Sequence, residues 1–143
     1  MNLGSLNYWP VLIAAIAAFV FGWLWYGGLS KQWMEARGLS TADAEQARAQ
    51  MGALPLVVTF IALLIMAWMF AGVLLHLARG GMAINIRTGL ISGFFLWLGF
   101  VITTLGVNYT FQGAKRALIA IDGAYWLGVL LLEGAILGWW GVA

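Results

Sequence analysis

The chain has 143 residues, of which 64% are hydrophobic and only 8% are charged, with nine tryptophans and no cysteine. A soluble domain carries about 25% charged residues, so this composition excludes a water-exposed surface for most of the chain. The net charge of +2, without any basic run, gives no indication of nucleic-acid binding. The absence of cysteine excludes disulfides, thiolate metal sites and cysteine nucleophiles.

Four apolar stretches are long enough to cross a bilayer, because a spanning helix needs roughly 20 such residues. They cover about 9–29, 54–78, 86–107 and 118–141. No Lys or Arg precedes the first stretch, so we expect an uncleaved span rather than a secretory signal. The sequence predicts an all-α polytopic membrane protein, with residues 1–143 forming a single four-span domain.

Lys and Arg are distributed unevenly between the loops. The loops after the first and third spans hold Lys31, Arg37, Arg48, Lys115 and Arg116. Only Arg79 and Arg87 lie on the opposite side, between the second and third spans. The positive-inside rule therefore predicts both termini outside and the loops 31–53 and 108–117 in the cytoplasm. We expect the bacterial inner membrane as the location.

The first cytoplasmic loop contains a predicted helix of its own. Ser40 followed three residues later by Asp43 is typical of a capping box. Good helix formers follow over 41–51, and Gly52 ends the run. One side of this short amphipathic helix carries Leu39, Ala44, Ala47 and Met51. We expect it to rest on the membrane surface or on the inner ends of the spans; a site for a cytoplasmic partner is the alternative.

Small residues recur at four-residue spacing on three of the spans. They are Ala14, Ala18 and Gly22, then Gly89 and Gly93, then Gly134 and Gly138. Membrane helices associate through close backbone approach and polar contacts, so these faces predict helix packing, within the bundle or between copies of the chain. The two halves of the sequence show no convincing repeat, which weakens an inverted-repeat transporter.

Two stretches carry a resemblance to a known family. One is FGWLWYGGLSKQWMEARGLS at 21–40; the other joins GFVITTLGVNYTFQG to IDGAYWLGVLLLEGAILGWW near the end of the chain. Over nearly its full length the chain resembles a bacterial membrane family catalogued as domain of unknown function 1761. The resemblance implies a four-helix membrane protein and supplies no activity. Glu133 departs from the pattern, because relatives are expected to carry an apolar or neutral residue there.

Several polar residues from three spans arrive at one depth near the predicted cytoplasmic face. With a rise of about 1.5 Å per residue, this level holds Tyr26, Asn108, Asp122 and Tyr125. We interpret the aromatic residues as an interfacial belt or, alternatively, as the wall of a polar pocket around Asp122. Asp122 has partners within reach in Lys115, Arg116, Tyr26 and Asn108, which would make it a structural anchor.

Glu133 lies deeper, about 16 Å along the helix axis from Asp122 and on the same stripe. Carboxylates inside a span are costly and usually mark function. At this depth desolvation favours the neutral acid. Three interpretations stay open: a protonated structural group, a proton-binding carboxylate that couples to transport, or an oligomer contact. Partners that could reach it are Ser92 and, by stretching, Arg87 and His76.

The sequence offers little support for metal or enzyme chemistry. His76 is the only histidine and there is no cysteine, so we expect no metal. We expect no cofactor either. The few Ser and Thr have no histidine at matching depth, and no nucleophile–base set is recognisable. An enzyme acting on lipid would require Asp122 and Tyr26 in an open pocket, and this class has the least support.

The leading hypothesis is a non-enzymatic inner-membrane protein that acts as a self-oligomer or as an accessory subunit of a larger membrane complex. Its expected partners are the lipid bilayer and other membrane proteins, and no nucleic acid. The alternative is a proton-coupled carrier or channel for a small solute that uses Glu133 and Asp122.

Overall fold

A computed structural model describes residues 5–143 of the chain, and every element in this range is helical. The elements are α1 (Tyr8–Gly28), α2 (Ser30–Arg37), α3 (Thr41–Met51), α4 (Leu54–Arg79), α5 (Ile86–Leu96), the π-helical η2 (Trp97–Val101), α6 (Ile102–Phe111) and α7 (Arg116–Trp140). The predicted all-α fold is confirmed. Four helices are long and apolar enough to cross a membrane: α1, α4, the continuous helix Ile86–Phe111, and α7. The third of these runs four residues past its predicted end.

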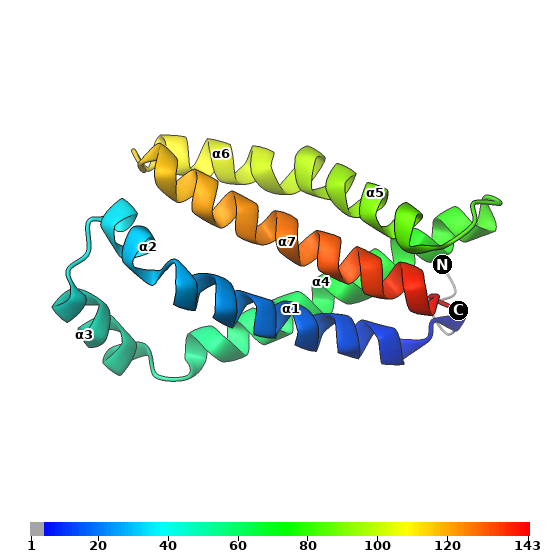
Figure 1. The fold of residues 1–143 in the computed structure, drawn as a ribbon, viewed down its shortest axis with the longest axis horizontal. Helices are drawn as coiled ribbons and strands as arrows, with labels where there is room; N and C mark the ends of the chain where they lie inside the picture. Colours follow the sequence, from blue (N-terminus) through cyan, green and yellow to red (C-terminus); the bar gives the residue numbers. More distant parts are fainter. Residues whose placement is uncertain (1–4) are drawn as a thin grey trace.

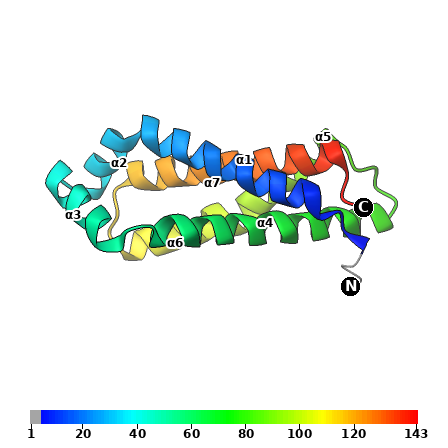
Figure 2. The same cartoon turned by 90° about the horizontal axis from the view of Figure 1, so that it is seen from below.

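Helix α7 occupies the centre of the bundle (Figure 1). It packs against α1 on one side and against α5, η2 and α6 on the other, while α4 packs mainly on α1. Helices α2 and α3 lie together at one end, which we call the α2 end (Figure 2). The start of α1 and the end of α7 meet at the opposite, terminal end, where the Asn7 N–H donates to the Val142 carbonyl at 3.1 Å.

Short polar side chains begin several of the helices. The Asn7 side chain accepts a hydrogen bond from the N–H of Trp9, and the Asn85 side chain accepts one from the N–H of Thr88 at 3.0 Å. Pro55 stands in the first turn of α4, where its missing N–H costs no hydrogen bond. These residues begin the helices without adding charge within the membrane.

The expected small-residue faces all lie against other helices of the same chain. Ala14 and Ala18 of α1 have no exposed surface. Gly22 faces Tyr125, and a Cβ there would lie 3.0 Å from the tyrosine hydroxyl. Small side chains let backbones approach closely, and this explains how α1 meets α7.

The crossing of α5 and α7 is closer still. A Cβ on Gly89 would strike the carbonyl of Gly134, and a Cβ on Gly134 would strike the carbonyl of Gly89. A Cβ on Gly93 would lie 2.6 Å from the Leu130 carbonyl oxygen, and one on Gly138 would strike the carbonyl of the residue that caps α5. The glycines are therefore required by backbone contact along this seam.

The predicted helix over 41–51 is confirmed as α3. The Ser40 hydroxyl accepts from the Asp43 N–H at 3.1 Å, and the Asp43 carboxylate accepts from the Ser40 N–H at 3.0 Å, which completes the capping box. No residue of α3 is buried, and Met51 is 51% exposed. The side of α3 that was expected to rest on the membrane surface or on the inner ends of the spans is partly buried at Leu39, Ala44 and Ala47 and exposed at Met51.

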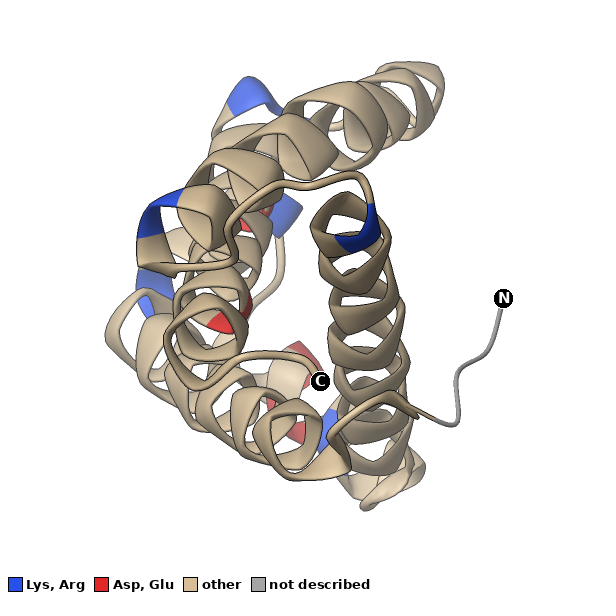
Figure 3. Ribbon diagram, turned by 90° about the vertical axis from the view of Figure 1, so that its right-hand side faces the viewer, with Lys and Arg blue, Asp and Glu red and all other residues tan. Residues whose placement is uncertain are grey.

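Charged residues are few along the spans (Figure 3), whose ribbons carry no charge over most of their length. Two carboxylates are the exceptions within α7. Asp122 is 7% exposed and Glu133 is not exposed at all. These two residues define the candidate sites.

Candidate functional site

Asp122 accepts hydrogen bonds from three side chains that come from three other helices. The Tyr26 hydroxyl donates to Oδ1 at 2.7 Å, and the Trp33 indole nitrogen donates to the same oxygen at 3.2 Å. The Tyr109 hydroxyl donates to Oδ2 at 2.6 Å. An ionised carboxylate accepts hydrogen bonds only, and all three neighbouring groups can donate to it. Asp122 thus ties α1, α2 and α6 to α7.

Two further indole groups hold the α7 backbone beside Asp122. Trp25 of α1 donates to the Ile121 carbonyl at 3.2 Å, and Trp97 of η2 donates to the Gly123 carbonyl at 2.8 Å. The two carbonyls flank Asp122 in sequence, so α7 is fixed from both sides at this level. The crowding of aromatic residues in the first part of the chain therefore serves specific hydrogen bonds.

Tyrosine rings continue the site toward the middle of the bundle. The rings of Tyr26 and Tyr125 are 4.9 Å apart, and Phe21 stacks on Tyr125 with centroids 6.0 Å apart. Tyr125 is 4% exposed. The structure therefore brings Tyr26, Asp122 and Tyr125 together, as the sequence suggested.

Asn108 does not belong to this cluster, in contrast to the sequence-based expectation. It is exposed, and its neighbour Tyr109 makes the contact with Asp122. One residue corresponds to about 100° of rotation around a helix, so the two side chains point in different directions. Lys115 is not a partner of Asp122 either, because its ammonium group donates to the Glu35 carbonyl at 3.1 Å.

Sequence reasoning missed Trp33 and Tyr109. Trp33 lies on α2, a helix that the sequence did not predict, and the Arg37 guanidinium sits 4.9 Å from the centre of its ring. A tryptophan four residues before an arginine is compatible with one turn of helix. That spacing was the available signal for α2, and it gives no information on the contact with Asp122.

Glu133 is buried in the packed interior of the bundle. Neither carboxyl oxygen has a hydrogen-bond partner among the described residues. Of its expected partners, His76 and Arg87 are exposed and Ser92 makes no hydrogen bond to it. Its neighbours along the same stripe, Val129 and Leu137, have no exposed surface.

The register of α1 against α7 shows what faces Glu133. Gly22 meets Tyr125, and the Phe21 ring lies where a Cβ on Gly128 would be. Continuing this antiparallel register places the buried pair Ala14 and Ala15 at the level of Glu133. The residues of α1 at this level therefore carry only methyl side chains, which offer no hydrogen bond.

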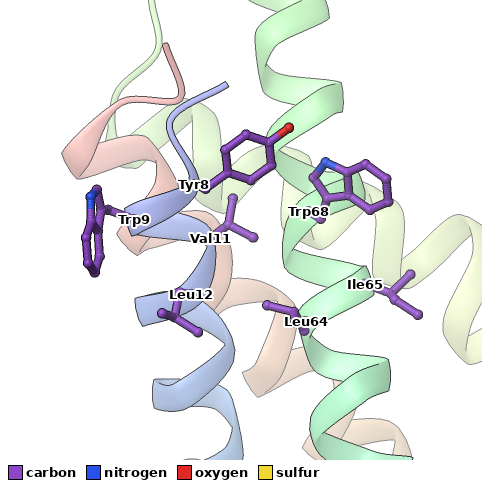
Figure 4. Close-up of a pocket in the computed structure, with 7 residues that line it drawn as sticks. All are labelled: Tyr8, Trp9, Val11, Leu12, Leu64, Ile65 and Trp68. Carbon is purple, nitrogen blue, oxygen red and sulfur yellow. The ribbon is translucent and has the colours of Figure 1, made fainter. Parts of the chain in front are cut away.

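A groove of about 440 Å³ lies between α1 and α4 toward the terminal end (Figure 4). It is lined by Tyr8, Trp9, Val11, Leu12, Leu64, Ile65 and Trp68. Trp9 and Ile65 are strongly exposed, so the groove opens on the outside of the bundle. The lining is almost entirely apolar and contains neither intramembrane carboxylate. It has the character of a lipid-facing furrow rather than of a solute site.

Among residues 5–143, no three His, Cys, Asp or Glu side chains come together as a metal site would require. Asp122 and Glu133 are instead each surrounded by groups of other kinds. The arrangement offers a carboxylate saturated with donors at one level and a carboxyl without partners at another.

The family described as protein of unknown function (DUF1761) matches residues 9–138. This chain belongs to that family. The match spans all four membrane helices and includes both carboxylates, and it confirms the resemblance seen in the sequence. No curated protein and no solved structure matches the chain.

Proposed function

We propose that this protein acts by association, as an oligomeric or accessory subunit of the bacterial inner membrane. The observation that carries the proposal is the free face of the third span. Only 6% of the most apolar part of Ile86–Phe111 is buried, against 39% of α7. This span packs on α7 and makes little contact with α4, so most of its circumference is available to another membrane helix.

The glycines of this span support the same proposal. Gly89 and Gly93 lie against α7, whereas the sites of a Cβ on Gly99 and Gly106 have no other part of the chain within 4 Å. Thr103, one turn after Gly99, is exposed. Small and hydroxyl residues are the ones that membrane helices use to associate. The half of the span near the α2 end therefore carries an unused surface of that kind.

Cross-linking through introduced cysteines tests the proposal, because the native chain has none. Val107→Cys on α6 and Val20→Cys on α1 replace valines of similar exposure, 57% and 48%. In native membranes we expect oxidation to give a covalent dimer with Val107→Cys and not with Val20→Cys. Monomer only at both positions, or dimer at both alike, would contradict self-association through the third span.

A substitution at Gly106 separates association from folding. A Cβ at Gly106 meets nothing in this chain, so Gly106→Leu should leave the thermal stability of the monomer unchanged. The same change should abolish the Val107→Cys cross-link, because a bulky side chain blocks close approach. A cross-link that survives Gly106→Leu would rule out this face as the contact.

The proposed location has both termini outside and the α2 end in the cytoplasm, on the basis of five Lys and Arg against two. Gln46→Cys on α3 and Ala143→Cys at the terminal end report on the two sides. In intact spheroplasts a membrane-impermeant maleimide should label Ala143→Cys and not Gln46→Cys. The reverse pattern would invert the topology.

A second candidate function is a proton-coupled carrier or channel for a small solute. The observation that favours it is the Glu133 carboxyl, which is fully buried and lacks a hydrogen-bond partner among the described residues. Ionisable groups within a span mark proton or ion pathways by default. Protein reconstituted in vesicles with a pH gradient should show proton flux, and Glu133→Gln should abolish it while the fold is retained. Equal flux in the wild type and the variant would exclude Glu133 as the coupling group.

A further inference from the structure

We infer that Glu133 is a proton-binding site that exchanges its proton with the α2 end of the bundle, through the tyrosine hydroxyls beside Asp122, and not with the nearer terminal end. The inference rests on the second candidate function only in treating the carboxyl as a proton site. It requires no transport of a solute, so protonation and flux are measured separately below.

Distance alone would favour the terminal end. Glu133 precedes Trp140, the last residue of α7, by seven residues, which is about 10 Å of helix. It follows Arg116, the first residue of α7, by 17 residues, which is about 25 Å. The side chains around Glu133, rather than its depth, decide which route is open.

The route to the terminal end is closed by apolar packing. Buried residues on this side of Glu133 are Leu6, Val11, Leu74, Leu75, Leu137 and Val142. The charged or titratable side chains of the spans at this end are His76 and Arg79 of α4, Arg87 of α5 and Tyr8 of α1, and all four are exposed. Within the described part of the chain, the buried indole nitrogen of Trp68 on this side has no hydrogen-bond partner, so no hydrogen-bonded side chains link Glu133 to this surface.

The route to the α2 end is polar over most of its length. Tyr109, which is partly exposed, donates to Asp122, and so does Tyr26. The Tyr26 ring lies 4.9 Å from Tyr125, which stands on α7 about two turns before Glu133. No other titratable side chain of α1, α4, α5 or α7 lies in this half of the bundle, apart from Arg116 at the start of α7. Two tyrosine hydroxyls bound to Asp122 and the adjacent ring of Tyr125 thus extend from the surface of the bundle to within about two turns of the buried carboxyl.

One apolar layer separates Tyr125 from Glu133. It contains Val129 of α7 and Ala18 of α1, both without exposed surface. Helical side chains tilt toward the N-terminus of their helix, so the Glu133 side chain leans toward this layer. The apolar barrier on the α2 side is therefore the stretch of about two turns between Tyr125 and Glu133, whereas on the terminal side no buried titratable side chain of the described residues interrupts the packing.

The test measures which compartment sets the protonation of Glu133. The full chain carrying Gln46→Cys on α3 is reconstituted in lipid vesicles, and vesicles with α3 outward are captured through an impermeant biotin–maleimide. The infrared band of the protonated carboxyl is followed while the pH is changed on one side at a time. Loss of the band in Glu133→Gln identifies it.

We expect the protonated fraction of Glu133 to follow the pH on the α2 side, falling about tenfold per pH unit above its midpoint. A change of one pH unit on the terminal side should alter the protonated fraction less than about twofold. A band that follows the terminal side, or that ignores both sides, overturns the inference. Proton flux measured in the same vesicles distinguishes the access route from the carrier function. If the band follows the pH on the α2 side and no flux is found, the access route is supported and the carrier function is rejected.

Matched tyrosine variants test the route itself. After a pH jump on the α2 side, Tyr125→Phe should slow the response of the band about tenfold or more, since a positioned proton donor is lost. Tyr8→Phe removes a hydroxyl from the other end of the bundle and should leave the response unchanged. Equal rates in Tyr125→Phe and the wild type would overturn the assignment of the tyrosines to the route.

Discussion

The backbones of Gly89 and Gly134 are in direct contact where α5 crosses α7, because a Cβ on either residue would overlap the carbonyl of the other. The ring of Phe70 from α4 also reaches this crossing, 3.0 Å from the position of a Cβ on Gly134. The crossing therefore joins three of the four spans through two helix backbones and an aromatic ring.

Alanine at Gly89 or at Gly134 should therefore destabilise the bundle by about 1–3 kcal/mol or more, the usual cost of overpacking. The midpoint of thermal unfolding in detergent, followed by intrinsic tryptophan fluorescence, measures the effect. Gly106→Ala is the matched control, since its Cβ enters open space on the same span. Equal midpoints for the variants and this control would show that the α5–α7 crossing tolerates a methyl group.

Because three side chains donate to Asp122, replacing Asp122 should destabilise the fold more than replacing one of its donors. Tyr109→Phe removes one hydrogen bond to a charged group and should cost about 1.5–3 kcal/mol. Asp122→Ala should cost more than that, because it leaves Tyr26, Trp33 and Tyr109 without their common acceptor. Unfolding midpoints rank the two, and Trp33 fluorescence should shift in Asp122→Ala when its indole loses the carboxylate. An Asp122→Ala variant as stable as Tyr109→Phe would contradict a shared acceptor.

The spans and α3 were predictable because their signals are local. Length and hydropathy define a membrane helix, and Ser40 with Asp43 forms the expected capping box. Helix α2 was not predictable, since its stability depends on tertiary contacts such as Trp33 with Asp122. A short helix with a distant partner gives no periodic signal of its own.

The misplacement of Asn108 has a geometric cause. A π-helical segment, Trp97–Val101, interrupts the third span, and a wider turn inserts an extra residue into the helix. Residues beyond the segment are therefore rotated relative to a regular helix, and it is Tyr109, not its neighbour Asn108, that contacts α7. Regular periodicity carried through the span cannot show this change, and π-helical turns are frequent at functional sites.

The start of α3 should respond to acid. Hydrogen bonds from the Ser40 hydroxyl and N–H hold the pKa of Asp43 below its ordinary value. A lowered pKa stabilises the folded helix at neutral pH, and this contribution is lost as the pH falls below about 4 toward the pKa of the folded form. Backbone ¹³C chemical shifts should show fraying of the first turn of α3 in acid, and at neutral pH in Ser40→Ala. Glu45→Gln, outside the capping box on the same helix, should show no fraying at neutral pH; fraying there equal to that in Ser40→Ala would contradict the role of the box.

The buried Glu133 carboxyl should lower the stability of the fold, and its replacement should reveal whether it is kept for a function. A buried polar group without a hydrogen bond costs about 1–3 kcal/mol, and neither carboxyl oxygen of Glu133 has a hydrogen-bond partner among the described residues. Glu133→Leu should therefore raise the unfolding midpoint, whereas Glu133→Gln, which keeps a polar group of the same size, should raise it less. Residues that reduce stability persist where activity requires them. A Glu133→Leu protein that is more stable than the wild type but has lost its proton flux would therefore identify the carboxyl as functional. A lower midpoint in Glu133→Leu would instead mean that the carboxyl is a structural contact in the membrane.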